Sequence, residues 1–90
     1  MAAKNPNTIE LYGITFNVNP NMFEDNYELV ELLNELDEHP FKFPEYIKMI
    51  TGDKYDEVKE ALRGDDGIIP LTAMRQFAED FGHKVSALKN

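Results

Sequence analysis

The sequence predicts a mainly α-helical fold with a small N-terminal β-hairpin, an α+β arrangement in which about four to five short helices form a compact bundle. Apolar residues alternate on either side of a Tyr-Gly pair near the start of the chain, which indicates the hairpin. In the remainder of the chain they recur with the spacing of one face of an α-helix. With 90 residues, of which 42% are hydrophobic, the chain suits one domain with a modest core.

The hairpin is predicted over residues 8–18, with Tyr12 and Gly13 forming a two-residue turn. This turn pairs Leu11 with Ile14 and places alternate side chains on the same face of the sheet. The side chains that share the apolar face are then Ile9, Leu11, Ile14, Phe16 and Val18. Because an isolated hairpin is marginally stable, we expect this face to pack on the helices. The hairpin either covers the core only or also offers an exposed edge for strand addition.

The central helix of the predicted bundle runs from Asp25 to Glu38. Asp25 followed by Glu28 has the form of a capping box, and the run from Asp37 to Pro40 ends the helix. Its apolar stripe lies at positions i, i+3, i+4 and i+7 and consists of Leu29, Leu32, Leu33 and Leu36, widened by Val30. We interpret this helix as the element on which the rest of the domain packs.

Two shorter helices are predicted on either side of the central one. Asn19-Pro20 supplies an N-cap and a proline at the first helical position, which predicts a short helix that carries Met22 and Phe23 inward. After Pro40, an aromatic connection leads into a helix that ends at Thr51-Gly52. The helically spaced apolar residues of this second segment are Phe43, Tyr46, Ile47 and Ile50.

Two more helices are predicted in the last part of the chain. Asp53 caps the first of them and Gly64 ends it, with a buried side formed by Tyr55, Val58, Ala61 and Leu62. The last helix begins at Pro70 or Thr72, and its apolar stripe consists of Leu71, Met74, Phe77, Ala78, Phe81, Val85 and Leu88. Gly82 is its weak point, because glycine inside a helix costs up to about 1 kcal/mol relative to alanine. We expect the helix either to bend or to fray beyond it.

The chain is strongly acidic, with a formal net charge of −8 and a pI near 4.6. This charge disfavours nucleic acid and anionic lipid as partners and favours a basic or aggregation-prone protein. The chain has no cysteine, and no apolar run approaches the roughly 20 residues of a membrane span. Its start lacks the plan of a signal peptide. We therefore expect a flexible terminus over residues 1–7, a single domain over residues 8–90, and a cytoplasmic location.

No residue pattern predicts a metal or cofactor site. The loop around Gly67 imitates part of an EF-hand, but its twelfth position is Ala73, where calcium binding needs a bidentate glutamate. We interpret this loop as a turn from which Ile68 or Ile69 reaches the core. His39 and His83 are isolated, whereas a zinc site needs three or four ligands.

Catalysis has no support in the sequence either. Ser86 is the only serine, and it lacks a nucleophile motif. The many carboxylates are typical of solvated helix faces rather than of a paired catalytic acid and base. We therefore expect a protein that is not an enzyme and has no catalytic residues, metal or cofactor.

The order of features along the chain carries a family resemblance. Its successive parts are a hairpin, Asn19-Pro20, an acidic leucine helix, a helix ending in Gly52-Asp53-Lys54-Tyr55, then Ala61-Leu62-Arg63-Gly64-Asp65-Asp66-Gly67, a helix with Met74, and the end Leu88-Lys89-Asn90. From Thr8 to Asn90 this order resembles the small tail assembly chaperones of long-tailed phages and prophages of Gram-positive bacteria. The chain departs from the family pattern at Ile50-Thr51-Gly52, where the family carries Leu-Leu-Gly.

The resemblance implies a non-catalytic protein that binds the tape-measure protein and keeps it soluble until tail-tube subunits assemble around it. Such a chaperone acts in the cytoplasm of the bacterial host and is absent from the mature virion. The expected partners are the tape-measure protein and the tail-tube protein, without nucleic acid or membrane. The family commonly makes a longer product by ribosomal frameshifting, in which the last helix continues into an extension.

We expect partner contact from aromatic side chains with spare exposure, and self-association through the same faces is left open. The candidates are Phe41, Phe43 and Tyr46 near the connection, and Phe77 and Phe81 on the last helix. The alternative for each is that it completes the core. A competing function is an acidic inhibitor or DNA mimic whose carboxylates occupy a basic nucleic-acid site on another protein. A third alternative is an enzyme, which requires that carboxylates distant from one another in this sequence converge in a pocket.

Overall fold

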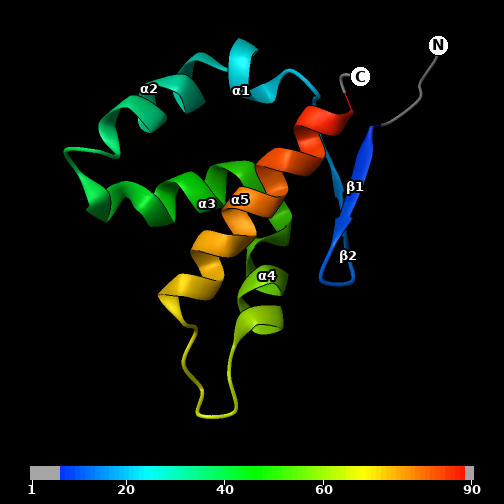
Figure 1. Cartoon of the computed structure of the whole chain (residues 1–90), viewed down its shortest axis with the longest axis vertical. Helices are drawn as coiled ribbons and strands as arrows, with labels where there is room; N and C mark the ends of the chain where they lie inside the picture. Colours follow the sequence, from blue (N-terminus) through cyan, green and yellow to red (C-terminus); the bar gives the residue numbers. More distant parts are fainter. Residues whose placement is uncertain (1–6, 89–90) are drawn as a thin grey trace.

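The computed structural model describes residues 7–88, which form a two-stranded hairpin followed by helices (Figure 1). The strands are β1 (Thr8–Leu11) and β2 (Ile14–Asn17). The α-helices are α1 (Met22–Asp25), α2 (Tyr27–Glu35), α3 (Phe43–Thr51), α4 (Tyr55–Leu62) and α5 (Leu71–Ala87), and the short 3-10 turns η1 (Pro40–Lys42) and η2 (Gly52–Lys54) precede α3 and α4. The predicted fold class, mainly α with an N-terminal hairpin, is confirmed.

The hairpin has the predicted register, with Leu11 opposite Ile14. Tyr12 and Gly13 have φ values of 54° and 78°, the two positive values that a type I′ turn requires. The Val18 N–H donates to the Asn7 carbonyl at 2.9 Å, which extends the ladder by one pair. Apart from Asn7, the flexible terminus predicted over residues 1–7 lies outside the described residues.

The core is centred on α5, which packs on β1 (Figure 1). Phe77, Phe81 and Val85 of this helix are completely or almost completely buried. The other buried apolar side chains are Ile9, Leu11, Ile14, Phe16, Leu29, Leu32, Tyr46, Ile47, Ile50, Val58 and Met74. They come from the hairpin and from every α-helix except α1, so the apolar face of the hairpin covers the helices as predicted.

Helix α2 differs from its prediction at both ends and on one side. It begins at Tyr27, because the Asn26 side chain caps it by accepting the Leu29 N–H at 3.2 Å, and it ends at Glu35. The prediction that Leu33 lies in the core is wrong, because this side chain is 37% exposed. Leu33 lies about 100° around the helix from Leu32, on the edge of the buried arc rather than within it.

The boundaries of α1 and α4 also differ from those predicted. Helix α1 has Asn21 at its N-cap position, and the Asn21 side chain makes no capping hydrogen bond. The Asn19 side chain, predicted as the cap, accepts the Asn21 N–H at 2.8 Å, and Met22 and Phe23 pack against the edge of the core. Helix α4 begins after η2 with no side-chain cap, so the prediction that Asp53 caps it is wrong. Its end also differs, since Gly64 lacks a left-handed conformation and the extended backbone of Arg63 terminates the helix. Ala61 is exposed.

Helix α5 continues without interruption through Gly82 to Ala87, so neither the predicted bend nor the predicted fraying occurs within the described residues. Four positions of its predicted stripe are buried, but Leu71 is 55% exposed because it is the first residue of the helix. In the preceding loop, Ile69 packs against the core and Ile68 does not. No helix within residues 7–88 is long and apolar enough to cross a bilayer.

Candidate partner-binding surfaces

A groove of about 220 Å³ lies between α2 and the η1–α3 segment. Its lining residues are Glu28, Glu31, Leu32, Glu35, Lys42, Glu45 and Met49. The α2 residues are spaced at i, i+3, i+4 and i+7, and those of the opposite side at i, i+3 and i+7. Because these are the spacings of one helix face, the groove is bounded by two rows of side chains that follow the two helices.

The charge of this groove is predominantly negative, with four carboxylates and a single ammonium group. The ammonium of Lys42 donates a hydrogen bond to Glu35 Oε1, joining the end of α2 to η1. This hydrogen bond is the main reason that the pKa of Glu35 is lowered and that of Lys42 is raised. The nearby carboxylates of Glu45 and Glu31 raise the pKa of Lys42 further. The groove therefore already holds one cationic side chain among its glutamates.

The predicted aromatic contacts divide into exposed and buried residues. Phe41 lies in η1, next to Lys42 in the chain, and is 92% exposed. Phe43 is half-buried, and its ring stacks on Tyr46 with centroids 6.2 Å apart. For Tyr46, Phe77 and Phe81, the expectation of spare exposure is wrong: they are buried in the core.

The exposed and the buried aromatic residues differ because of their positions relative to the buried faces of the helices. Tyr46 lies on the buried face of α3, while Phe77 and Phe81 lie on the buried stripe of α5. Phe41 precedes α3 in a turn that has no buried residue. The structure therefore retains Phe41 as an accessible candidate, with Phe43 partly accessible, and assigns the other three to the alternative that they complete the core.

After Phe41, the three most exposed large apolar side chains within residues 7–88 are not among the predicted contacts. Tyr27 is 75% exposed at the start of α2, and Ile68 is 63% exposed in the loop before α5. Leu71 follows at the first position of α5. The position of Tyr27 directly after the capping Asn26 is the only sequence signal that separates it from the buried leucines.

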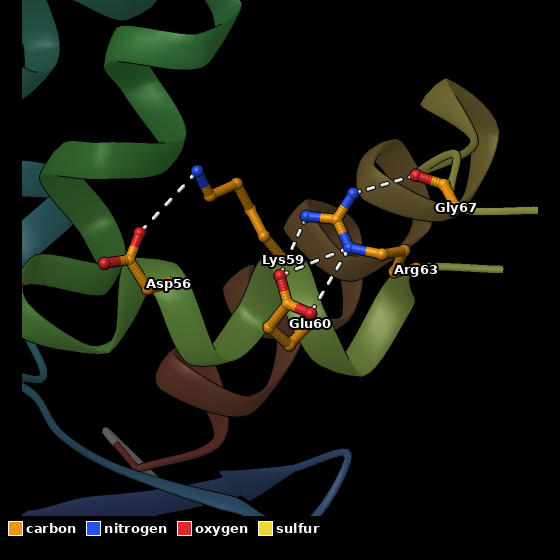
Figure 2. Close-up of polar contacts among 5 residues, drawn as sticks. All are labelled: Asp56, Lys59, Glu60, Arg63 and Gly67. Carbon is orange, nitrogen blue, oxygen red and sulfur yellow. Dashed lines mark hydrogen bonds and ion pairs between the residues drawn. The ribbon is translucent and has the colours of Figure 1, made fainter.

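The loop that carries Ile68 is held by Arg63 (Figure 2). Two guanidinium nitrogens of Arg63 contact the Glu60 carboxylate, the shortest contact being 2.8 Å, and Nη1 donates to the Gly67 carbonyl at 2.8 Å. The hydrogen bond from Arg63 is the main cause of the lowered pKa of Glu60. Asp66 adds a second constraint by accepting the Ile68 N–H at 3.0 Å. This part of the Leu-Arg-Gly-Asp-Asp-Gly stretch therefore organises its own loop.

Two further grooves lie beside the hairpin. One of about 470 Å³ lies between β1 and the end of α5, and its lining residues are Thr8, Ile9, Glu10, His83, Lys84, Ala87 and Leu88. The other, of about 520 Å³, lies between β2 and α4, with Ile14, Asp56, Glu57, Glu60 and Ala61 as its lining. The first groove mixes acidic and basic groups. In the second, Asp56 and Glu60 already pair with Lys59 and Arg63 (Figure 2).

Among residues 7–88, no group of three or more His, Asp or Glu side chains is placed to hold a metal ion. His39 and His83 are both exposed; His39 precedes η1, and His83 lies in α5. Comparison of the chain with protein-family models, curated proteins and solved structures finds no match.

Proposed function

We propose that this chain is a tail assembly chaperone of a long-tailed phage or prophage, which binds the tape-measure protein and keeps it soluble during tail assembly. It performs no chemistry in this role. It acts in the cytoplasm of the bacterial host and is absent from the finished virion. The observation that carries the proposal is the order of features from Thr8 to Asn90, which resembles that family.

Two properties of the molecule support the proposal on physical grounds. The net charge of −8 makes complexes that contain this chain repel one another, which opposes aggregation of an apolar partner. The exposed side chains of Phe41 and Met49 offer apolar surface to a helical partner. A long helical tape-measure protein presents such apolar stripes before the tail tube surrounds it.

Co-expression tests the proposal. The tape-measure protein from the same gene cluster is produced alone, with this chain, or with an unrelated acidic protein of similar size and charge. We expect soluble tape-measure protein that co-purifies with this chain, and insoluble protein in the other two cultures. Equal insolubility with and without this chain contradicts the proposal, as does equal rescue by the unrelated acidic protein.

A second candidate function is an acidic inhibitor or DNA mimic, favoured by the row of three glutamates on α2 with Glu45 of α3 opposite. Such a protein occupies a basic site on a nucleic-acid-handling enzyme or repressor. A pull-down from infected or induced cells separates the two candidates. Recovery of a polymerase, nuclease or repressor that loses nucleic-acid binding supports the mimic, whereas recovery of the tape-measure protein supports the chaperone.

A further inference from the structure

We propose that the groove between α2 and α3 receives a basic amphipathic helix of the partner, whose lysine or arginine side chains pair with the glutamate row of α2 and with Glu45 while an apolar side chain packs on the exposed Met49. This inference rests on the proposed function only for the identity of the partner. The chemistry of the recognised segment follows from the groove itself.

The charge of the groove selects a basic occupant. Glu28, Glu31 and Glu35 line one side, Glu45 lies on the other, and Lys42 is the only cationic group between them. A second copy of this chain is a poor occupant because it carries 17 acidic residues against nine lysines and arginines. A helix with a row of lysines or arginines instead complements the groove in charge.

The shape of the groove selects a helix of about two turns. From Glu28 to Glu35 the α2 row spans eight residues, whose ends lie roughly 10 Å apart along the helix axis. A partner helix lying along this row presents side chains at i, i+3 or i+4, and i+7. The exposed Met49 provides most of the apolar contact, because Leu32 is only 7% exposed, and methionine adapts its shape to different partners.

Lys42 occupies the position that the partner's cation takes. Its ammonium donates to Glu35 Oε1, and the carboxylates of Glu31 and Glu45 also act on it. The groove therefore binds an ammonium group in the free chain, and a bound partner exchanges this internal pair for an intermolecular one. Removing the Lys42 charge leaves Glu35 free for the partner, so that affinity for a basic helix increases.

The other two grooves do not offer the same arrangement. Next to β1, Lys84 and His83 oppose a basic helix. Next to α4, all three carboxylates come from one helix and are already paired, with Lys54, Lys59 and Arg63. Asp53 in η2 and Glu79 in α5 are exposed and line none of the three grooves, so their neutralisation provides a charge-matched control.

The experiment measures binding of a synthetic helical peptide of about 18 residues. The peptide carries lysines at i, i+4 and i+7 beside a leucine row, and a matched peptide has glutamate in place of each lysine. Fluorescence anisotropy is recorded for four proteins: the parent, the double variant Glu28→Gln/Glu31→Gln, the control double variant Asp53→Asn/Glu79→Gln, and Lys42→Met.

We expect the parent to bind the lysine peptide and not the glutamate peptide. The groove double variant loses about tenfold in affinity, while the control double variant changes less than about twofold. Lys42→Met binds several-fold more tightly than the parent. A general attraction between opposite charges predicts only a minor increase in affinity for any change of a single charge. Equal losses in the two double variants overturn the inference, as does weaker binding by Lys42→Met.

The co-expression assay with the same variants keeps this inference separate from the proposed function. If the parent and the groove double variant solubilise the tape-measure protein equally well, the groove inference fails and the proposed function stands. If the parent binds the lysine peptide as described but does not solubilise the tape-measure protein, the proposed function fails and the groove stands. Burial of the groove between two copies of the chain, detected as a dimer that Glu28→Gln/Glu31→Gln dissociates, also overturns the inference.

Discussion

Phe16 of β2 meets Phe81 of α5 edge-on, with ring centroids 5.4 Å apart and ring planes at 81°. Phe77 completes the group, with its centroid 5.9 Å from Phe16 and 5.8 Å from Phe81. All three side chains are buried, and edge-on or tilted aromatic pairs add to the stabilisation from burial. The hairpin and the last helix are therefore joined through an aromatic cluster rather than through the leucine helix.

The aromatic cluster leads to the first prediction. Phe81→Ala is expected to lower the free energy of unfolding by about 3–5 kcal/mol, because it removes a fully buried ring and leaves a cavity. Urea unfolding followed by circular dichroism measures the change. Phe41→Ala is the matched control and should change stability by less than about 0.5 kcal/mol, since Phe41 is exposed. Similar losses in the two variants would show that the assignment of core and surface is wrong.

The two sides of α2 give the second prediction. Leu29→Asp should unfold the domain, because it places a carboxylate at a fully buried position. Leu33→Asp should leave a folded protein with modestly reduced thermal stability, because the side chain at this position reaches solvent. Thermal melts of both variants check the expectation. A Leu33→Asp variant that is unfolded at room temperature would return Leu33 to the core.

Much of the fold is encoded locally and was predictable on that account. The hairpin register follows from the Tyr12-Gly13 turn and the alternating side chains, and the buried stripe of α5 follows from its spacing. Caps were harder to predict where two candidates are adjacent: Asp25 and Asn26 both have capping side chains, and only the structure shows that Asn26 is used. Leu33 has the right spacing for the core, but the width of the buried arc depends on what packs against it.

The candidate surface was less predictable than the fold. Aromatic composition alone does not separate Phe41 from Phe77, because exposure is decided by tertiary packing. The groove between α2 and α3 joins residues that are local in sequence, yet the Glu35–Lys42 pair depends on how the chain reverses through η1. A run of glutamates at helical spacing indicates a solvated face and carries no information about the helix that lies opposite it.

Gly82 provides a third prediction. Gly82→Ala should stabilise the protein by about 0.5–1 kcal/mol, because α5 is continuous at this position and no atom lies within 4 Å of an added Cβ. Gly67→Ala should have the opposite effect, since Gly67 has φ of +86° and alanine is strained there. Denaturant unfolding of both variants gives the two signs. Destabilisation by Gly82→Ala would indicate that α5 bends in solution.

The contacts of Arg63 give a fourth prediction. Arg63→Lys keeps the positive charge but loses the forked contact with Glu60 and the hydrogen bond to the Gly67 carbonyl. The loop then opens more often, so hydrogen exchange at the Gly64 and Gly67 amides should become faster. Exchange at the buried Phe77 and Phe81 of α5 should be unchanged, because the guanidinium is exposed and contributes little to global stability. Uniformly faster exchange would contradict a local role.

Burial of Tyr46 gives the last prediction. Burial raises the pKa of the Tyr46 phenol above its ordinary value of 10.0. The folded chain therefore holds this proton to a higher pH than the unfolded chain, so the free energy of unfolding declines as pH rises beyond that value. Below it, the phenol is protonated in both states and its contribution is constant. Tyr46→Phe removes the titrating group and should make the alkaline loss of stability less steep.

Urea unfolding of the parent and of Tyr46→Phe at pH 8 and at a pH of about 10.5 measures how steeply the free energy of unfolding of each protein declines with pH. Tyr12, whose pKa is raised chiefly by desolvation and also by Asp80, contributes with the same sign and is retained in the variant, so Tyr46→Phe reduces the alkaline loss without abolishing it. Tyr27→Phe serves as the control because Tyr27 is exposed, and it should follow the parent at both pH values. An alkaline loss as steep in Tyr46→Phe as in the parent would mean that the phenol at position 46 reaches solvent, and α3 would then have to be rotated relative to the core.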